Sequence, residues 1–338
     1  MISEFIEFSI ENETGIIKLN RPKSLNALNY EMASIFLDNL LEWKKDKKLK
    51  RVLLYGEGNS FCAGGDVKSL FLSSNKNDLK KKFFQKEYLL NNSINEFTKN
   101  YLSIWDGIVM GGGVGLSIYG NNRLVSEKAK FAMPETAIGF FPDVGGSYFL
   151  SRLKKGNGLF LGLTGKACNA RDMMDLGLAT HYLPSDWISK AKNEYIDNGN
   201  LNTSSYYPEM SSEIIENQDL IEDIFQESTL KNITNKLKKV KSEFGQKIYS
   251  HLLTRCPMSL AVTTKLINTS KSKTLRECLS IEYQLSQHMV YRNDFNNGVD
   301  SILVSKSLKP QWNPSAIDKI NCEELNKMFE PTAEKLYL

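Results

Sequence analysis

Alternating apolar and polar positions at the start of the chain predict two strands. Residues 5–10 and 15–19 alternate with a period of two, and residues 12–15 between them have the polar and glycine composition of a turn. The next segment, 24–46, places its apolar residues at helical spacing. The chain therefore begins with a predicted hairpin followed by a predicted helix.

Strand and helix patterns then alternate as far as about residue 200. The predicted strands lie at residues 52–55, at 101–105, within 123–133 and at 178–183, and the predicted helices lie at 78–98, in a buried glycine-rich segment from 110, at 147–163 and at 170–177. Alternation with short gaps is typical of right-handed parallel crossovers, so we expect an α/β fold.

The strand pattern ends after about residue 200. Residues 198–212 are polar and rich in turn formers, and the remainder has mostly helical patterning with a proline-rich segment at 309–315. We therefore predict two parts, residues 1–205 and 206–338, which is a division that 338 residues can support.

Composition narrows the class of protein. The chain is 41% hydrophobic and 24% charged with a formal net charge of +4, which is ordinary for a globular protein and gives no reason to expect nucleic acid as a partner. No apolar run reaches the roughly 18–20 residues that span a membrane. Because the N-terminus has neither a signal nor a transit pattern, we expect a cytoplasmic protein without a membrane partner.

Cysteine and histidine usage argues against metal and disulfide chemistry. The five cysteines are widely spaced without a CxxC pair, and the three histidines are scattered. Neither arrangement is typical of a disulfide framework, a structural zinc site or a serine–histidine–aspartate triad. We therefore expect no metal and predict that each cysteine is a reduced, small hydrophobic residue.

Two glycine-rich loops are candidates for backbone chemistry. "FCAGGD" (61–66) and "MGGGVG" (110–115) each follow a predicted strand and precede a predicted helix. Glycine lets the backbone approach a ligand closely, and unpaired N–H groups at a helix start favour negative charge. Two such loops could form an oxyanion hole. The alternative is that these glycines only allow close packing of helix on sheet.

Two acids lie in an unusually apolar stretch, "FAMPETAIGFFPDVGGSYF" (131–149). Burying an unpaired carboxylate costs several kcal/mol. Glu135 and Asp143 therefore either have partners in the fold or serve a reaction that uses poorly solvated acids.

Several stretches, taken in order, carry a family resemblance. They are "NRPKSLNALN", "FCAGGDV", "GIVMGGGVGLSIYG", "FAMPETAIGFFPDVGGSYFLSRL" and "LTGKACNARDMMDLGLATHYL", and they resemble the crotonase (enoyl-CoA hydratase/isomerase) superfamily. With "FFQKEYLLNN" and "DFNNGVDSILVSKSLKPQW" they resemble, within it, the 3-hydroxyisobutyryl-CoA hydrolases. The resemblance extends over nearly the whole chain and implies a crotonase-type ββα spiral core with a mostly helical C-terminal region.

The resemblance also implies site residues. The backbone N–H groups of Gly65 and Gly112 would form the oxyanion hole for the thioester carbonyl. Glu135 would be the catalytic carboxylate and Asp143 the second acid, which would raise the pKa of one member of the pair. Glu87 matches a glutamate that contacts the substrate, where it could accept a hydrogen bond from a 3-hydroxyl group.

The coenzyme A part of the substrate would be held by an early loop. The resemblance implies contacts from the backbone around Ser24, Leu25, Ala27 and Ala63. Asp66, at the end of the first glycine loop, is predicted to contact substrate and to cap a helix. An acyl-CoA is then the expected partner, and no separate cofactor is expected.

The acids decide the reaction. Hydratases of this superfamily typically use a second glutamate three residues after the middle glycine, and here that position is Gly115. The resemblance therefore favours hydrolysis of 3-hydroxyisobutyryl-CoA, or of 3-hydroxypropionyl-CoA, in which Glu135 either attacks directly or activates water. Asp106 and Trp105 depart from the family pattern beside the second loop, and an unpaired charge there would disfavour an anion.

Two other functions and the assembly stay open. An enoyl-CoA isomerase, or another acyl-CoA enzyme of the hydratase type, can work with one carboxylate at a position like Glu135. Some crotonase-type relatives are associated with RNA or ribosomes without catalysis, and the sequence pI of about 8.6 is compatible with that. The resemblance also allows a homo-oligomer.

Overall fold

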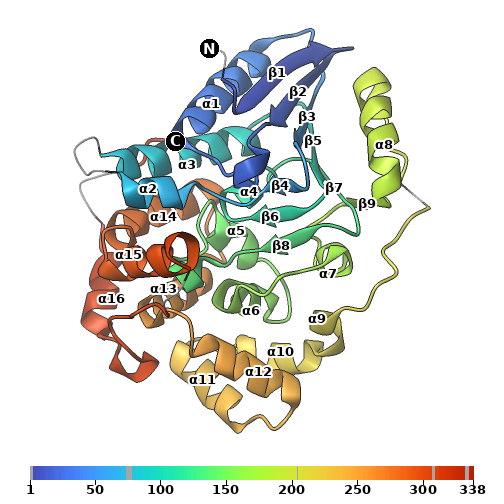
Figure 1. The fold of residues 1–338 in the computed structure, drawn as a ribbon. Helices are drawn as coiled ribbons and strands as arrows, with labels where there is room; N and C mark the ends of the chain where they lie inside the picture. The colour runs from blue at the N-terminus through green and yellow to red at the C-terminus, as the bar shows by residue number, and fades with distance from the viewer. Residues whose placement is uncertain (1–2, 74–77, 204, 307–308, 332–334) are drawn as a thin grey trace. The chain divides into compact units, whose positions relative to one another are not determined.

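The computed structural model describes residues 3–73, 78–203, 205–306, 309–331 and 335–338 (Figure 1). The chain forms two compact units, and each is assembled from three separate stretches. Unit 1 comprises Met1–Asp66, Lys86–Ala132 and Ala167–Ser212, and unit 2 comprises Val67–Gln85, Met133–Lys166 and Glu213–Leu338. The chain passes between the units repeatedly, so the single division at residue 205 stays a prediction.

Unit 1 contains a six-stranded sheet in the order β1-β2-β3-β5-β7-β9. Its strands are β1 (Ile6–Glu11), β2 (Thr14–Leu19), β3 (Arg51–Gly56), β5 (Asn100–Trp105), β7 (Asn122–Val125) and β9 (His181–Tyr182). β1 and β2 form the predicted antiparallel hairpin, and every later pairing in this sheet is parallel. The predicted alternation of strands with crossovers is therefore confirmed.

A second, three-stranded sheet in unit 1 was only partly predicted. It consists of β4 (Ser60–Cys62), β6 (Ile108–Met110) and β8 (Lys130–Ala132), all parallel. The sequence indicated β8, but residues 61–62 of β4 and residue 110 of β6 were counted in the glycine loops, and the rest of both strands was not assigned. Strands of three residues show too few alternations to be recognised by their period. Their ends lead directly into the two glycine loops.

Helices cover the larger sheet of unit 1. Trp43 and Phe36 of α1 (Tyr30–Lys45) contact Phe8 of β1 edge-on, with ring centroids 5.8 and 6.2 Å apart. On strands β3, β5 and β7, buried leucine and isoleucine side chains pack against Tyr195 and Ala191 of α8 (Ser185–Asn198), which lies along the sheet in Figure 1. Both helices thus bury one apolar face on the sheet.

The first helix begins six residues later than predicted. Asn29 caps α1 by accepting a hydrogen bond from the Met32 N–H, so the helix cannot extend back to residue 24. Residues 22–24 form a 3₁₀ turn, and Leu25 and Asn26 then take positive φ angles of 50° and 57°. A left-handed pair interrupts the helical path that the apolar spacing suggested.

Other helices also differ from the predictions. The predicted helix at 147–163 is two helices, α5 (Gly146–Leu150) and α6 (Asn157–Thr164), separated where Gly156 has φ of 75°. α4 (Gly112–Gly115) is buried as predicted but is a single turn. α8 was not predicted, because its mostly polar sequence buries only two side chains, Ala191 and Tyr195.

Unit 2 is built from helices, and the described residues from 205 onward contain no strand. Its helices are α2 (Val67–Leu72), η3 (Glu135–Ile138), α5, α6, α9 (Glu213–Glu216), α10 (Gln218–Phe225), α11 (Leu230–Lys239), α12 (Glu243–Leu252), α13 (Pro257–Thr269), α14 (Leu275–Met289), α15 (Asn293–Val299), η4 (Asp300–Val304), η5 (Ile317–Lys319) and α16 (Cys322–Met328). Helix α3 (Leu79–Asn95) begins in unit 2 and ends in unit 1. The mostly helical C-terminal region is therefore confirmed.

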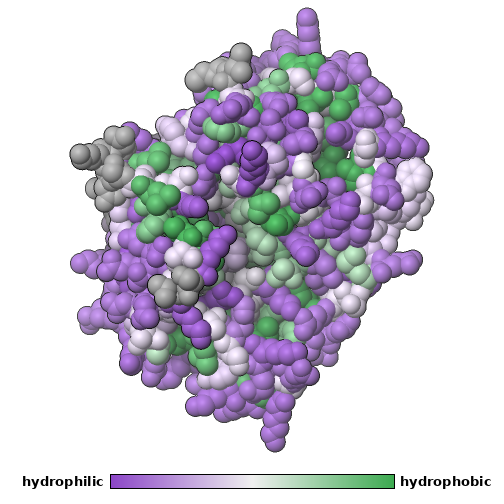
Figure 2. All heavy atoms as spheres, viewed as in Figure 1, coloured by the Kyte–Doolittle hydropathy of each residue, from purple (hydrophilic) through white to green (hydrophobic). Residues whose placement is uncertain are grey.

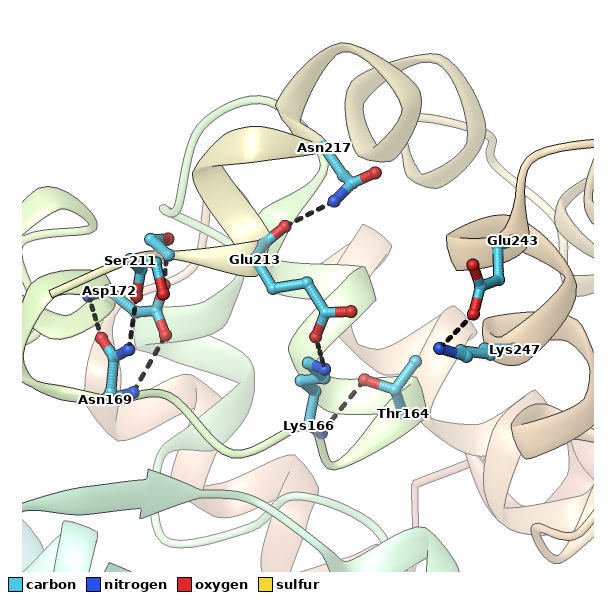
Figure 3. A network of polar contacts seen from close by, with 10 residues as sticks. Thr164, Lys166, Asn169, Asp172, Ser211, Glu213, Asn217, Glu243 and Lys247 are labelled. Carbon is cyan, nitrogen blue, oxygen red and sulfur yellow. Dashed lines mark hydrogen bonds and ion pairs between the residues drawn. The ribbon is translucent and has the colours of Figure 1, made fainter.

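Polar contacts anchor the ends of the connection that follows α8. In unit 1, Asn169 and Asp172 form a capping box on α7 (Ala170–Asp175), and the Asn169 amide donates to the Ser211 carbonyl at 2.9 Å (Figure 3). The Ser212 hydroxyl donates to Asp172. In unit 2, Lys166 pairs with Glu213. Residues 198–203 and 205–212 include the predicted polar connection, and Ser204 lies outside the described residues.

The surface is mainly polar where it can be seen. On the face drawn in Figure 2, hydrophilic side chains predominate and hydrophobic ones form small separate patches. Among the described residues, no helix has the length and apolar character needed to cross a bilayer.

Candidate functional site

The first glycine loop is fixed by pairing with the segment before α1. The Leu28 N–H donates to the Gly64 carbonyl and the Asp66 N–H donates to the Leu28 carbonyl, both at 2.8 Å. Neighbouring backbone groups in an extended segment point in opposite directions. The N–H group of Gly65, between these two residues, therefore points away from Leu28, as an oxyanion donor would require.

The second glycine loop lies against the first. Gly112 is the first residue of α4, where a helical N–H has no partner within the helix. A Cβ atom added at Gly112 would lie 2.4 Å from Oε1 of Glu87 and 2.9 Å from the Gly65 nitrogen. Unit 1 thus brings together three of the predicted site residues, and only glycine fits at position 112.

The predicted coenzyme A loop is also ordered within unit 1. The Ala63 N–H donates to the Leu25 carbonyl at 2.9 Å, and the Ala27 N–H donates to the Ser24 carbonyl at 3.0 Å. The buried Asn26 side chain bonds the carbonyls of residues 57 and 60, which holds the left-handed turn in place. The predicted contacts Ser24, Leu25, Ala27 and Ala63 therefore lie on one cross-linked loop.

Asp66 has a partner in the same region. Its carboxylate forms an ion pair with Arg21 at 3.0 Å, and Arg21 also donates to the Ala27 carbonyl at 2.6 Å. α2 begins at Val67, directly after Asp66, as predicted. The ion pair ties the end of the glycine loop to the start of the predicted coenzyme A loop.

Glu135 is a buried acid in unit 2. It opens the short η3 helix and is only 6% exposed, and its Oε2 atom has no hydrogen-bond partner among the described residues. The Thr136 hydroxyl donates to the Leu163 carbonyl, and the Thr136 carbonyl accepts from the Cys256 N–H, so η3 is held on two sides. Burial, with the charge of Asp143 adding to it, raises the pKa of Glu135 well above its ordinary value.

Asp143 begins a tight turn close to Glu135. It is 5% exposed, and its carbonyl accepts a hydrogen bond from the Gly146 N–H at 2.7 Å. The two residues between, Val144 and Gly145, have positive φ angles of 53° and 76°. Unit 2 therefore brings the two predicted acids together, with Asp143 carried on a left-handed turn.

A third buried acid was missed in the sequence. Glu282 of α14 has no exposed surface, and its carboxyl oxygens accept from Gly145 N–H at 2.6 Å, Ser147 N–H at 2.9 Å and the Ser147 hydroxyl at 2.5 Å. Burial first, and then the charge of Asp143, raise its pKa to about 8 against the lowering effect of these hydrogen bonds. An acid between apolar residues in "CLSIEYQL" was the available signal.

Asn91 is a second residue that the sequence reasoning did not assign. It is fully buried on α3, one turn after Glu87, and neither polar atom of its amide has a hydrogen-bond partner among the described residues. Buried amide groups are nearly always paired, so Asn91 is a candidate for contact with water or a ligand. The Glu-x-x-x-Asn spacing on a predicted helix was the signal.

The unusual residues beside the second loop, Trp105 and Asp106, make contacts with neighbouring residues. Asp106 accepts a hydrogen bond from the Ser126 hydroxyl, and Trp105 is fully buried and stacks on Phe131. The Asp106 carboxylate is therefore hydrogen-bonded, but a neutral hydroxyl does not cancel its charge. The indole N–H of Trp105 has no hydrogen-bond partner among the described residues.

The cysteines, all of which the structure describes, form no disulfide. All five cysteines are free thiols, and four are buried as expected, but Cys322 is exposed at the start of α16. The prediction of reduced thiols is confirmed for all five, and Cys322 differs in lying on the surface instead of in a hydrophobic core. Across the ranges that the structure describes, no group of three or more His, Cys, Asp or Glu residues could hold a metal ion.

Comparison with known proteins extends over almost the entire chain. Residues 14–329 match the family model described as enoyl-CoA hydratase/isomerase. The chain is 38% identical over 330 residues to a Xenopus laevis protein named 3-hydroxyisobutyryl-CoA hydrolase, mitochondrial, covering 93% of this chain and 86% of that protein. The Homo sapiens protein of the same name is 37% identical over 332 residues, covering 94% and 86%.

Solved structures share the fold. A carnitinyl-CoA dehydratase from Mycobacterium thermoresistibile superposes with a TM-score of 0.92 at 32% identity, covering 99% of each chain. An enoyl-CoA hydratase from Rhodobacter sphaeroides 2.4.1 superposes with a TM-score of 0.93 at 28% identity, covering 99% of this chain and all of the other.

Proposed function

Because the chain belongs to the enoyl-CoA hydratase/isomerase family, we propose that it hydrolyses a 3-hydroxyacyl-CoA thioester, with 3-hydroxyisobutyryl-CoA as the first substrate to test. The observation that carries the proposal is the similarity, over more than nine-tenths of the chain, to proteins named as hydrolases of that thioester. The name of the substrate points to valine breakdown as the pathway. 3-Hydroxypropionyl-CoA is the second substrate.

Thioester hydrolysis needs a group that binds the developing oxyanion. In the proposed reaction, the N–H groups of Gly65 and Gly112 donate to the thioester carbonyl oxygen as it gains negative charge. The support is that Gly112 lies against the Gly65 nitrogen within unit 1 and leaves no room for a side chain. One such donor is worth roughly 3–4 kcal/mol of barrier.

The reaction also needs a nucleophile or a base, for which we assign Glu135. Two routes are open to its carboxylate. It attacks the carbonyl carbon to form a mixed anhydride that water then hydrolyses, or it removes a proton from the attacking water. Both routes consume one water molecule, and the departing sulfur takes a proton. When water attacks the thioester directly its oxygen enters the acid, and in the anhydride route it enters either the acid or the regenerated Glu135 carboxylate. Asp143 orients or protonates a reacting group.

Glu87 is proposed to recognise the 3-hydroxyl group. Its carboxylate lies at Gly112 within unit 1, and a hydroxyl group near the thioester can donate to it. Backbone groups of the Ser24–Ala27 segment and Ala63, together with Asp66 on its ion pair with Arg21, would border the coenzyme A part.

A hydratase or isomerase is the competing function within the family. Two solved structures named as a hydratase and a dehydratase share this fold, but the fold alone does not choose the reaction. At position 115 the chain has a buried glycine, which has no side chain to move a proton. That observation favours hydrolysis over addition of water to a double bond.

A substrate panel tests the proposal. Release of free thiol is measured with 3-hydroxyisobutyryl-CoA and 3-hydroxypropionyl-CoA, while crotonyl-CoA reports hydration and a 3-enoyl-CoA reports isomerisation. We expect rapid thiol release from at least one 3-hydroxyacyl-CoA and little turnover of the other two. Turnover of crotonyl-CoA or 3-enoyl-CoA without thiol release would contradict hydrolysis. A salt-dependent RNA shift without any turnover would favour the RNA-associated function.

A further inference from the structure

The turn that carries Asp143 has a conformation its own sequence disfavours. Asp143 and Gly146 are joined by a hydrogen bond of 2.7 Å, and both residues between them have positive φ. Such turns normally use Gly, Asn or Asp at both central positions. Val144 has φ of 53°, which is a strained conformation for a β-branched residue. The turn therefore needs support from outside residues 143–146.

Glu282 provides contacts at this place from a distant part of the chain. One carboxyl oxygen accepts from the N–H of Gly145, inside the turn, and the other accepts from the N–H and hydroxyl of Ser147, just after it. Gly146, between these two residues, donates its own N–H to the Asp143 carbonyl. The Glu282 carboxyl group therefore holds the backbone on both sides of the hydrogen bond that closes the turn.

The position of Glu282 is costly unless these contacts matter. The residue has no exposed surface, and this burial disfavours its charged form and raises its pKa. A leucine on the buried face of α14 would avoid that cost, but it would leave two backbone donors unpaired. The contacts of Glu282 therefore fix the backbone on both sides of Gly146, and this offsets the cost of burying an acid.

We propose that Glu282 is a positioning residue for the reaction, which holds the Val144–Gly145 turn so that the Asp143 carboxyl group stays beside Glu135. The inference rests on the proposed function and adds a residue to it. Glu282 touches no reacting group in this account. Its effect passes through the backbone of one turn, and loss of that turn displaces the second acid.

Three variants test this role in the full chain. Glu282→Met keeps the length of the side chain and removes both acceptors, so we expect kcat to fall about 10- to 100-fold because the second acid is displaced. The KM should stay within about twofold. Glu282→Gln retains one acceptor for Ser147 and should recover part of the lost kcat. Adding Val144→Gly to Glu282→Met relieves the strain and should also recover part of it.

A matched control separates positioning from folding. Asp172 is a buried acid in unit 1 that accepts from a backbone N–H and from the Ser212 hydroxyl, as Glu282 does with Ser147. Asp172→Leu should lower the melting temperature and leave kcat of the folded protein close to wild type. All rates are measured at least about 15 degrees below the lowest melting temperature of the set, so that every variant is folded in the assay.

The outcomes separate the two claims. A Glu282→Met protein with wild-type kcat and only a lower melting temperature would overturn the positioning role. Failure of the wild type to release thiol would instead contradict the proposed function. In that case, amide hydrogen exchange still tests whether Glu282 holds the turn. The amides of Gly145 and Ser147 should exchange much faster in Glu282→Met than in Asp172→Leu. Equal exchange in the two variants would mean that Glu282 does not hold the turn.

Discussion

Two features of the surroundings of Glu135 act on its carboxyl group in the same direction. Its carboxyl group is buried without a hydrogen bond to Oε2 among the described residues, and it has a second acid as a neighbour. Both features make the charged form unfavourable, which costs stability. The same features make a poorly solvated carboxylate a stronger base and nucleophile, so the cost has a use if Glu135 reacts with a thioester.

The pH dependence of hydrolysis should report the raised pKa of Glu135. Because the reacting form is the carboxylate, kcat/KM should fall as the pH drops through that pKa, at a midpoint above the ordinary glutamate value of 4.5. Asp143→Asn removes a negative charge that raises this pKa, so the midpoint should move to lower pH even where the rate is reduced. A pH–rate profile checks both. An unchanged midpoint in Asp143→Asn would contradict the coupling.

Glu87 should determine whether a substrate with a 3-hydroxyl group is preferred over one without it. Glu87→Gln removes a charged acceptor for the 3-hydroxyl group, which is worth about 1.5–3 kcal/mol, or roughly 10- to 100-fold in kcat/KM. The matched substrate is isobutyryl-CoA, which lacks the hydroxyl and should lose little. Rates on the two substrates check this. An equal loss on both substrates would mean that Glu87 holds the oxyanion loop in position and does not recognise the hydroxyl group.

At the scale of elements, the two glycine loops depend on contact between backbones. In Gly112→Ala the new methyl group would lie 2.4 Å from Glu87 Oε1 and 2.9 Å from the Gly65 nitrogen, so the loops must separate. We expect a loss of about 10²- to 10³-fold in kcat, the usual effect of losing one oxyanion donor. Steady-state kinetics on the purified variant measures it.

Gly177→Ala is the control for that variant. Gly177 has φ of 71°, but a Cβ atom there would meet nothing within 4 Å. The substitution should strain the backbone and lower stability slightly while kcat stays close to wild type. If Gly112→Ala keeps a wild-type kcat, the second loop does not donate to the oxyanion.

Elements with a strong period could be predicted from the sequence, and short ones could not. The hairpin, the parallel strands β3, β5 and β7, and helix α3 occur where the pattern indicated them. Strands β4 and β6 have three residues each, so their pairing partners decide their structure more than their own sequence does. The start of α1 was wrong because the Asn29 cap and the left-handed pair before it override apolar spacing.

At the scale of the whole molecule, local sequence motifs identified much of the candidate site. They did not identify the residues that hold the site residues in position. Gly65, Gly112 and Glu87 come together in unit 1, and Glu135 and Asp143 come together in unit 2, from motifs that the sequence shows directly. Glu282 lies 135 residues from its partner Ser147, and a single sequence contains no signal for such a contact. The homo-oligomer and the cytoplasmic location stay predictions.

Buried acids should make the stability of the molecule depend on pH. The pKa of Glu282 is raised from 4.5 to about 8 in the folded chain, so the folded state binds a proton that the unfolded chain has released between those values. The stabilisation from this group is therefore complete below about pH 4.5 and is lost as the pH rises through about 8. Glu282→Gln cannot ionise and escapes that loss.

Melting temperatures of wild type and Glu282→Gln, measured between pH 5 and 9, check this sign. The melting temperature of the variant minus that of wild type should increase as the pH rises to about 8 and then level off. Other titrating groups cancel in the difference because they are common to both proteins. A difference that stays constant or decreases over this range would mean that the pKa of Glu282 is not raised.

We assign Glu135 as the reacting group of a thioester hydrolase, and a comparison of two proteins is the sharpest test of that assignment. Thiol release from 3-hydroxyisobutyryl-CoA is measured for wild type and for Glu135→Gln, which keeps the shape of the side chain and removes its charge. We predict rapid release by wild type, a loss of at least about 10³-fold in kcat in the variant, and a melting temperature at neutral pH that is not lowered, since a disfavoured buried charge has gone. A folded Glu135→Gln protein that releases thiol at the wild-type rate would contradict the account.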